Sequence, residues 1–98
     1  MHARVTTLDM DPARVDEVRD QLERDDVPEF KKLDGFKGMT LLAERQTGKT
    51  IAVTFWESED ALRQSEEAVK DARRRAAESG GAGEPEVARY EVILDTMA

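Results

Sequence analysis

Trp56, Ser65 and Tyr90 are the side chains whose types and positions could hold a small molecule in a pocket. An indole or phenol ring joins an apolar body to one polar atom, which suits an aromatic ligand. The Ser65 hydroxyl interrupts a helical stripe of small residues and could face a cavity. The sequence favours a structural interpretation for each residue: a packing anchor for Trp56, a core residue with a satisfied hydroxyl for Tyr90, and a hydroxyl bonded back to its own helical turn for Ser65.

The ionisable residues give no catalytic assignment. General acid–base catalysis needs a carboxyl group with a raised pKa in a pocket, and the 22 acidic residues are spread along the chain among basic ones. The chain has no cysteine, which excludes disulfides, thiolate catalysis and cysteine-bound metal sites. The one histidine, His2, is expected in solvent, and Arg73, Arg74 and Arg75 are expected to splay around their helix. The sequence predicts no metal site and no cofactor, and the catalytic residues stay unknown.

The composition limits the classes of partner. Charged residues make up 38% of the 98 positions and the formal net charge is −7, which disfavours contact with nucleic acid or an anionic bilayer. Apolar residues nowhere approach the length of a membrane span, and residues 1–8 lack the apolar run of a signal peptide. We therefore expect one domain over residues 1–98, located in the cytoplasm, with no nucleic-acid partner and no membrane partner.

The first half of the chain predicts a strand and then a helix. Residues 3–9 are rich in Val and Thr and predict a strand. Asp11 followed by Pro12 is a strong signal for the start of a helix, and its apolar stripe is Val15, Val18 and Leu22. Pro28 is expected to end or kink this helix near Asp25 or Asp26, with one further short turn carrying Phe30 and Leu33.

The second half predicts a hairpin, a helix and a last strand. Residues 36–44 and 50–56 read as strands joined by a turn in which Gly48 supplies the positive φ. A second helix begins near Ser58, which is a good N-cap, and ends in the glycine-rich loop 79–85. Residues 87–95 are expected to form the closing strand. The element order is therefore βαββαβ.

The central strands look semi-apolar on both faces, which predicts a homodimer. One face of 36–44 would carry Phe36, Thr40 and Leu42, and the other Met39, Leu41 and Ala43. In 50–56, one side carries Ile51, Val53 and Phe55, and the other Ala52, Thr54 and Trp56. Two helices can cover only one face of a four-stranded sheet, and a wet second face would be clearly polar. We expect the second face to pack against a copy of itself.

Two motifs point to a known family. Gly35-Phe36-Lys37-Gly38 stands at the start of the second predicted strand, and Val53-Thr54-Phe55-Trp56-Glu57-Ser58-Glu59-Asp60-Ala61-Leu62 leads from the third strand into the second helix. Together with the closing strand, these motifs resemble the antibiotic biosynthesis monooxygenase-type domains of the dimeric α/β-barrel superfamily, over nearly the whole chain. The resemblance implies an α+β, ferredoxin-like monomer with a four-stranded antiparallel sheet and a dimer whose sheets form a barrel.

The resemblance also implies a pocket between sheet and helices, with varied activities among the members. Haem-degrading relatives carry a second Trp and a haem-ligating His where Ser65 and roughly Arg75 stand here, so haem degradation is not expected. Relatives that form quinones without a cofactor use Trp, Tyr, Asn and Arg, and this chain has no Asn. The leading hypothesis is a dimeric barrel that binds a small aromatic ligand and acts as a cofactor-independent monooxygenase on a phenolic or polycyclic metabolite. The alternative is a non-catalytic ligand-binding or accessory protein using the same pocket.

Overall fold

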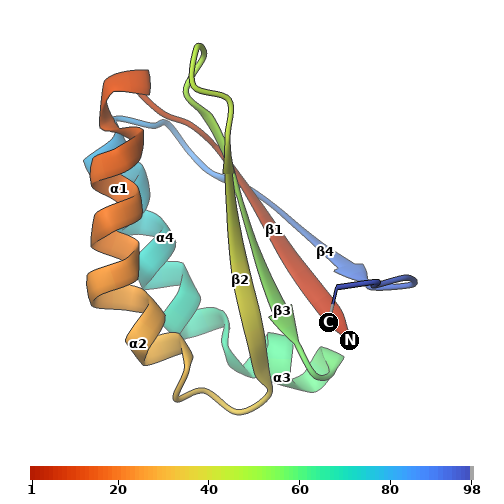
Figure 1. The fold of residues 1–98 in the computed structure, drawn as a ribbon. Coiled ribbons are helices and arrows are strands. Elements are labelled where there is room, and N and C mark those ends of the chain that lie inside the picture. The colour runs from red at the N-terminus through yellow and green to blue at the C-terminus, as the bar shows by residue number, and fades with distance from the viewer. Residues whose placement is uncertain (98) are drawn as a thin grey trace.

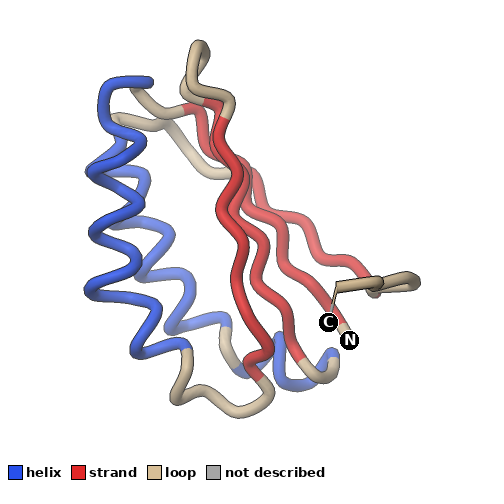
Figure 2. The backbone as a smooth tube through the Cα atoms, viewed as in Figure 1, coloured by secondary structure: helices blue, strands red, loops and turns tan. Residues whose placement is uncertain are grey.

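A computed structural model describes residues 1–97 as a four-stranded antiparallel sheet with helices on one face. The strands are β1 (His2–Asp9), β2 (Phe36–Ala43), β3 (Lys49–Trp56) and β4 (Glu86–Glu91), and the sheet order is β2-β3-β1-β4. Figure 2 shows the long helices on a single side of the strands, with the other side of the sheet uncovered. The α+β class and the βαββαβ order predicted from the sequence are confirmed.

The first helical region runs from Pro12 to Phe30 without a break. It consists of a 3-10 turn η1 (Pro12–Arg14), helix α1 (Val15–Gln21), a π-helical turn η2 (Leu22–Asp26) and helix α2 (Val27–Phe30). Asp11 caps the start, as predicted, by accepting a hydrogen bond from the Ala13 amide at 2.9 Å. Pro28 does not end the helix, because the chain widens into the π turn just before it and continues. The expected kink is therefore a local change of helical pitch.

The second helical region divides into two helices at Ser65. Ser58 is the N-cap predicted from the sequence and accepts a hydrogen bond from the Ala61 amide at 3.1 Å. Helix α3 (Glu59–Gln64) and helix α4 (Glu66–Gly80) replace the single helix that was expected. Gly81 ends α4 in the left-handed conformation, with φ of 68°, which a glycine adopts without strain.

The core lies between the helices and the sheet in two clusters. One joins β1 to α1 and the end of α4 through Leu8, Val15, Val18 and Leu22 among others. The second surrounds Trp56 and Leu62 near α3. Phe36 packs against this second cluster, so its predicted place beside Thr40 and Leu42 is wrong. A register shift between Phe36 and Gly38 turns the Phe36 side chain to the helix side, because one extra residue in a strand reverses the alternation that precedes it.

The uncovered face of the sheet carries rows of apolar residues. Residues opposite each other on neighbouring strands share a face, and Val53 lies opposite Thr40 on β2 and Val5 on β1, with Ala88 next to Val5 on β4. A second row contains Leu42 and Ile51, and a third contains Phe55, Ala3 and Tyr90. Leu42 and Tyr90 are among the exposed large apolar residues of the described chain. The semi-apolar character predicted for this face is confirmed.

The closing strand is shorter than predicted. β4 ends at Glu91 and not at Asp95, because its partner β1 begins at His2 and offers no ladder beyond that point. One further bond joins the Val92 amide to the Met1 carbonyl at 2.9 Å. Ile93 and Leu94 then leave the sheet and are almost fully exposed.

Candidate functional site

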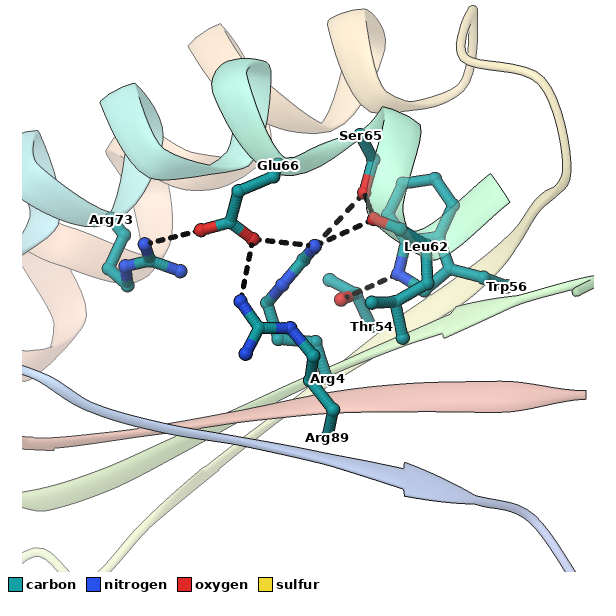
Figure 3. Close-up of polar contacts among 8 residues, drawn as sticks. All are labelled: Arg4, Thr54, Trp56, Leu62, Ser65, Glu66, Arg73 and Arg89. Atoms are coloured by element: carbon teal, nitrogen blue, oxygen red, sulfur yellow. Dashed lines mark hydrogen bonds and ion pairs between the residues drawn. The ribbon is translucent and has the colours of Figure 1, made fainter. Parts of the chain in front are cut away.

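A buried arginine on β1 occupies the space beneath α3. Arg4 is only 1% exposed. It donates hydrogen bonds to the Leu62 carbonyl at 2.8 Å and to the Ser65 hydroxyl at 3.2 Å, and its guanidinium lies 5.9 Å from the centroid of the Trp56 ring. Figure 3 shows these groups converging from β1, β3 and α3. Arg4 therefore fills a position that an alternating strand normally gives to an apolar side chain.

Glu66 connects Arg4 to two further arginines. Its carboxylate pairs with Arg4 at 2.8 Å, with Arg73 of α4 at 3.0 Å and with Arg89 of β4 at 3.3 Å. Arg4 and Arg89 stand directly opposite each other on β1 and β4, where like charges are destabilising. Because Glu66 lies at the start of α4 and reaches both, the helix supplies the counter-charge that this strand pair needs.

Burial disfavours the charged forms of Arg4 and Glu66, whereas the ion pairs between them favour these forms. Burial lowers the pKa of Arg4, the Glu66 carboxylate raises it, and the neighbouring Arg89 and Arg73 lower it further, with a net decrease. For Glu66, burial would raise the pKa, but the hydrogen bond from Arg73 and the charges of Arg4 and Arg73 outweigh it, so the pKa lies below its ordinary value. Glu66 is thus held as a carboxylate by its arginine neighbours.

An apolar cavity of about 40 Å³ lies between the sheet and the helices. Arg73 and two threonines of the sheet, Thr6 and Thr54, are the lining residues that carry polar atoms, but the surface they expose to the cavity is almost wholly apolar. The remaining lining is apolar and comes from both layers of the fold: Leu8, Met10, Leu22, Phe30, Met39, Leu41, Ala52, Val69, Ala72 and Ala76. An apolar chamber with a few polar groups is the usual form of a small-molecule site.

A groove on the β2 edge borders this cavity. It holds about 290 Å³ between β2 and the helical region from α1 to α2, and it shares Leu22, Met39 and Leu41 with the cavity. Leu22 opens the π turn η2, a feature that is frequent at functional sites. The inner cavity alone is smaller than the few hundred Å³ typical of ligand sites.

Trp56 supports the cavity without lining it. The indole is fully buried and donates a hydrogen bond from Nε1 to Thr54 Oγ1 at 3.0 Å. Its ring packs edge-on against Phe36 with centroids 5.3 Å apart. The packing-anchor interpretation is confirmed. Contact with a ligand through Trp56 stays a prediction, and the residue that joins Trp56 to the cavity is Thr54.

Ser65 and Tyr90 come from different layers of the fold, the helices and the sheet. The Ser65 hydroxyl donates to the Leu62 carbonyl at 2.6 Å, which is the bond back to its own helical turn that was predicted. Tyr90 is 56% exposed on the uncovered face of the sheet, so its interpretation as a core residue is wrong. The reason is that β4 is an edge strand whose Tyr90 face has no layer over it. As ligand-binding residues, Ser65 and Tyr90 stay predictions.

The residues that sequence reasoning missed are Arg4, Glu66, Arg73 and Thr54. Arg73 was expected on a solvated helix face, but its side chain is only 14% exposed. One sequence feature could have identified Arg4. It stands between two apolar residues in a Val- and Thr-rich strand, and no acidic residue shares its face of the strand.

Residues 1–97 contain no group of His, Cys, Asp and Glu arranged to bind a metal ion. Within the same range, every helix is too short or too polar to cross a bilayer.

The fold and the cavity define a ferredoxin-like α+β domain with a chamber between sheet and helices. Residues 1–79 match the family model described as antibiotic biosynthesis monooxygenase. The chain belongs to this family, as its motifs around Gly35 and Trp56 predicted.

The curated relatives are mycobacterial proteins of greater length. The chain is 40% identical to the uncharacterized protein Rv2558 of Mycobacterium tuberculosis over 81 residues, which are 79% of this chain and 33% of that protein. It is 35% identical to the uncharacterized protein Rv2557 of the same organism over 96 residues, or 94% of this chain and 41% of that protein. The chain therefore spans about a third to two-fifths of the length of these relatives.

Solved structures of monooxygenases and of a haem degrader share the fold. The monooxygenase from the gene ActVA-Orf6 of Streptomyces coelicolor, in complex with nanaomycin D, superposes with a TM-score of 0.80 at 19% identity and covers 99% of this chain and 91% of that one. The haem degrader MhuD of Mycobacterium tuberculosis, with two haems in its active site, gives 0.71 at 19% identity and covers 99% and 100% of the two chains. At these identities the likeness establishes the ferredoxin-like fold.

Proposed function

We propose that this chain forms a dimeric barrel that binds a small aromatic molecule and acts as a cofactor-independent monooxygenase on a phenolic substrate. The observation that carries the proposal is the apolar cavity between the sheet and the helices, whose lining includes Arg73, Thr6 and Thr54. Its support is family membership and the fold shared with a monooxygenase that holds nanaomycin D. One domain over residues 1–98 and a cytoplasmic location belong to the same proposal.

The chemistry would rely on the substrate more than on the protein. An ionised phenol supplies the electrons that reduce dioxygen; a ring C–H becomes C=O as one oxygen atom enters the quinone and the other leaves as water. The cavity would orient the ring, exclude water and stabilise the anionic oxygen. Thr54 suits this role because its oxygen already accepts from Trp56, which leaves its own hydrogen free to donate toward the cavity.

The dimer is proposed through the uncovered face of the sheet. Its central row of Thr40, Val53, Val5 and Ala88 is apolar enough to pack against a second copy. Light scattering at micromolar concentration should return a particle of twice the 11.0 kDa chain mass. Val53→Asp, at the centre of this face, should return the monomer, whereas a monomeric parent protein would contradict the proposed barrel.

Oxygen uptake tests the proposed activity directly. A panel of polycyclic phenols is incubated with the protein while dissolved oxygen and quinone absorbance are followed. Ala72→Leu should abolish uptake, because Ala72 lines the cavity and the larger side chain fills it. Ala68→Leu is the matched control, since Ala68 lies on the exposed face of the same helix. Uptake that is unaffected by Ala72→Leu would show that the reaction takes place elsewhere.

A non-catalytic ligand-binding or accessory role is the second candidate. The observation that favours it is that the lining of the cavity contains Arg73 and two threonines but no His, Asp, Glu or Tyr to move a proton. Ligand binding across the panel without oxygen uptake would select this role. A failure of every phenol to bind would contradict both functions.

A further inference from the structure

We propose that the cavity between the sheet and the helices receives dioxygen, the second reactant of the proposed reaction. The inference rests on the proposed function and assigns a place to the reactant that is not the aromatic substrate. It follows from three properties of the cavity: its volume, the apolar character of its surface, and its position beside the groove at the β2 edge.

The volume of the cavity suits a diatomic molecule better than an aromatic ring. It is about 40 Å³, whereas one water-sized molecule needs about 10–15 Å³. An apolar cavity that takes benzene has a volume of about 150 Å³, and sites for larger ligands begin at about 300 Å³. The cavity can therefore enclose dioxygen, whereas a phenol could place no more than the edge of its ring there.

The surface of the cavity favours an uncharged, apolar molecule over water. Almost all of the surface that the lining residues expose to the cavity is apolar. A buried water makes about two to four hydrogen bonds to polar groups, and an apolar surface offers few of them. We therefore expect the cavity to be dry. The side chains around a dry space lack contacts on one side, and a small apolar molecule such as dioxygen would supply these contacts.

The cavity and the groove share part of their lining. Leu22, Met39 and Leu41 line both spaces, and the groove is the larger one at about 290 Å³. A substrate ring in the groove would therefore contact the same side chains as dioxygen in the cavity. Met39 packs against both clusters of the core, and a methionine side chain is unbranched and changes its shape easily. The two reactants would then be separated by an adaptable side chain.

The first test uses the paramagnetism of dioxygen and needs no phenol. Methyl proton relaxation is measured by NMR on the protein under oxygen pressure and again under nitrogen. The oxygen-dependent relaxation of Val69 and Ala72, which line the cavity, should be several-fold faster than that of Val18 and Leu62. The latter two are also buried but do not line the cavity, so they report dioxygen that enters the core without a site. Equal relaxation in the two sets would overturn the inference.

The second test reduces the cavity with Ala72→Val, or with Ala76→Val if the first variant does not fold, since both residues line it. The substitution should remove the fast relaxation at Val69. In the reaction with a phenol it should raise the KM for dioxygen several-fold and leave the KM for the phenol nearly unchanged. Ala68→Val makes the same change on the exposed face of α4 and should alter neither KM.

The two tests separate a failure of this inference from a failure of the proposed function. A raised KM for the phenol with an unchanged KM for dioxygen would show that the ring fills the cavity, which overturns the dioxygen site while the oxygenase function stands. If no phenol supports oxygen uptake by the parent protein, the proposed function fails and the role of dioxygen as its reactant fails with it. The methyl relaxation then still decides whether the cavity takes dioxygen.

Discussion

Arg4 lies beneath Trp56 and is bonded to the carbonyl of Leu62, so one charged side chain ties β1 to β3 and α3. The guanidinium contributes a cation–π contact on one side and hydrogen bonds to helical groups on the other. The same guanidinium donates a hydrogen bond to the hydroxyl of Ser65, which lies at the break between α3 and α4. Arg4 therefore contacts the chain at the break where α4 follows α3.

Arg4→Ala should lower the free energy of unfolding by about 3 kcal/mol, because it leaves the Leu62 carbonyl and the Ser65 hydroxyl with fewer partners in the core. Arg4→Lys should recover only part of this loss, since an ammonium group cannot donate as a planar fork. Urea unfolding measures both. Arg19→Ala, which breaks exposed ion pairs of α1, is the control and should change stability by less than about 0.5 kcal/mol.

Thr54→Val should cost about 1–3 kcal/mol, because the buried Trp56 Nε1 would lose its acceptor. Trp56→Phe removes the donor as well, so in the double variant the substitution of Thr54 should cost much less than it does alone. The measurement is a double-mutant cycle of urea unfolding. Additive effects of the two substitutions would show that the bond between Thr54 and Trp56 contributes little.

The periodic parts of the fold were predictable from the sequence. Val15, Val18 and Leu22 recur at helical spacing and are buried as expected, because one stripe must face the sheet. Ser58 and Asp11 cap their helices through local hydrogen bonds that need no distant partner. Such features depend on neighbours in the chain, so the sequence contains all the information that they require.

The features that were missed depend on contacts between distant elements. Arg4 reads as a solvated charge unless Leu62 and Glu66 are brought to it by α3 and α4, and its bond to Leu62 joins residues 58 positions apart. Phe36 was assigned to the wrong face because the register shift before Gly38 is set by pairing with β3. The lining of the cavity is likewise assembled from distant strands and helices, which explains why Arg73 and Thr54 were not recognised as lining residues.

The stabilisation from Glu66 should depend on pH. Its pKa is lowered in the folded state, so its contribution is complete above the ordinary value of 4.5 and is lost as the pH falls through the lowered value. Glu66→Gln should therefore be less stable than the parent protein near neutral pH, and the difference should shrink below about pH 4.5. Urea unfolding of both proteins along a pH series measures it. A difference that stays constant into the acid range would contradict the role of the three arginines.

Asp26 and Arg75 should respond unequally to substitution. Asp26 is 2% exposed in the π turn and pairs with Arg75 of α4, which is about half exposed. Arg75→Ala leaves a buried carboxylate without its cation and should cost about 3 kcal/mol. Asp26→Asn removes the buried charge and returns Arg75 to water, so it should cost less. Chemical denaturation of the two variants measures which one loses more stability, and a larger loss in Asp26→Asn would contradict this prediction. Arg74→Ala is the exposed control on the same helix.

Gly48→Ala should be strongly destabilising, whereas Gly83→Ala should be nearly neutral. Gly48 turns the β2–β3 hairpin with φ of 83°, and a Cβ there would lie 2.0 Å from the Met10 carbonyl oxygen. That carbonyl belongs to the backbone segment whose Met10 amide donates to the Gly48 carbonyl at 3.1 Å, so it cannot move away without breaking the contact. We expect a loss of at least about 2 kcal/mol from strain and displacement together. Gly83 has open space around its Cβ position and serves as the control. Thermal unfolding of both variants measures the effect, and similar midpoints would show that the hairpin can shift away from β1 at little cost.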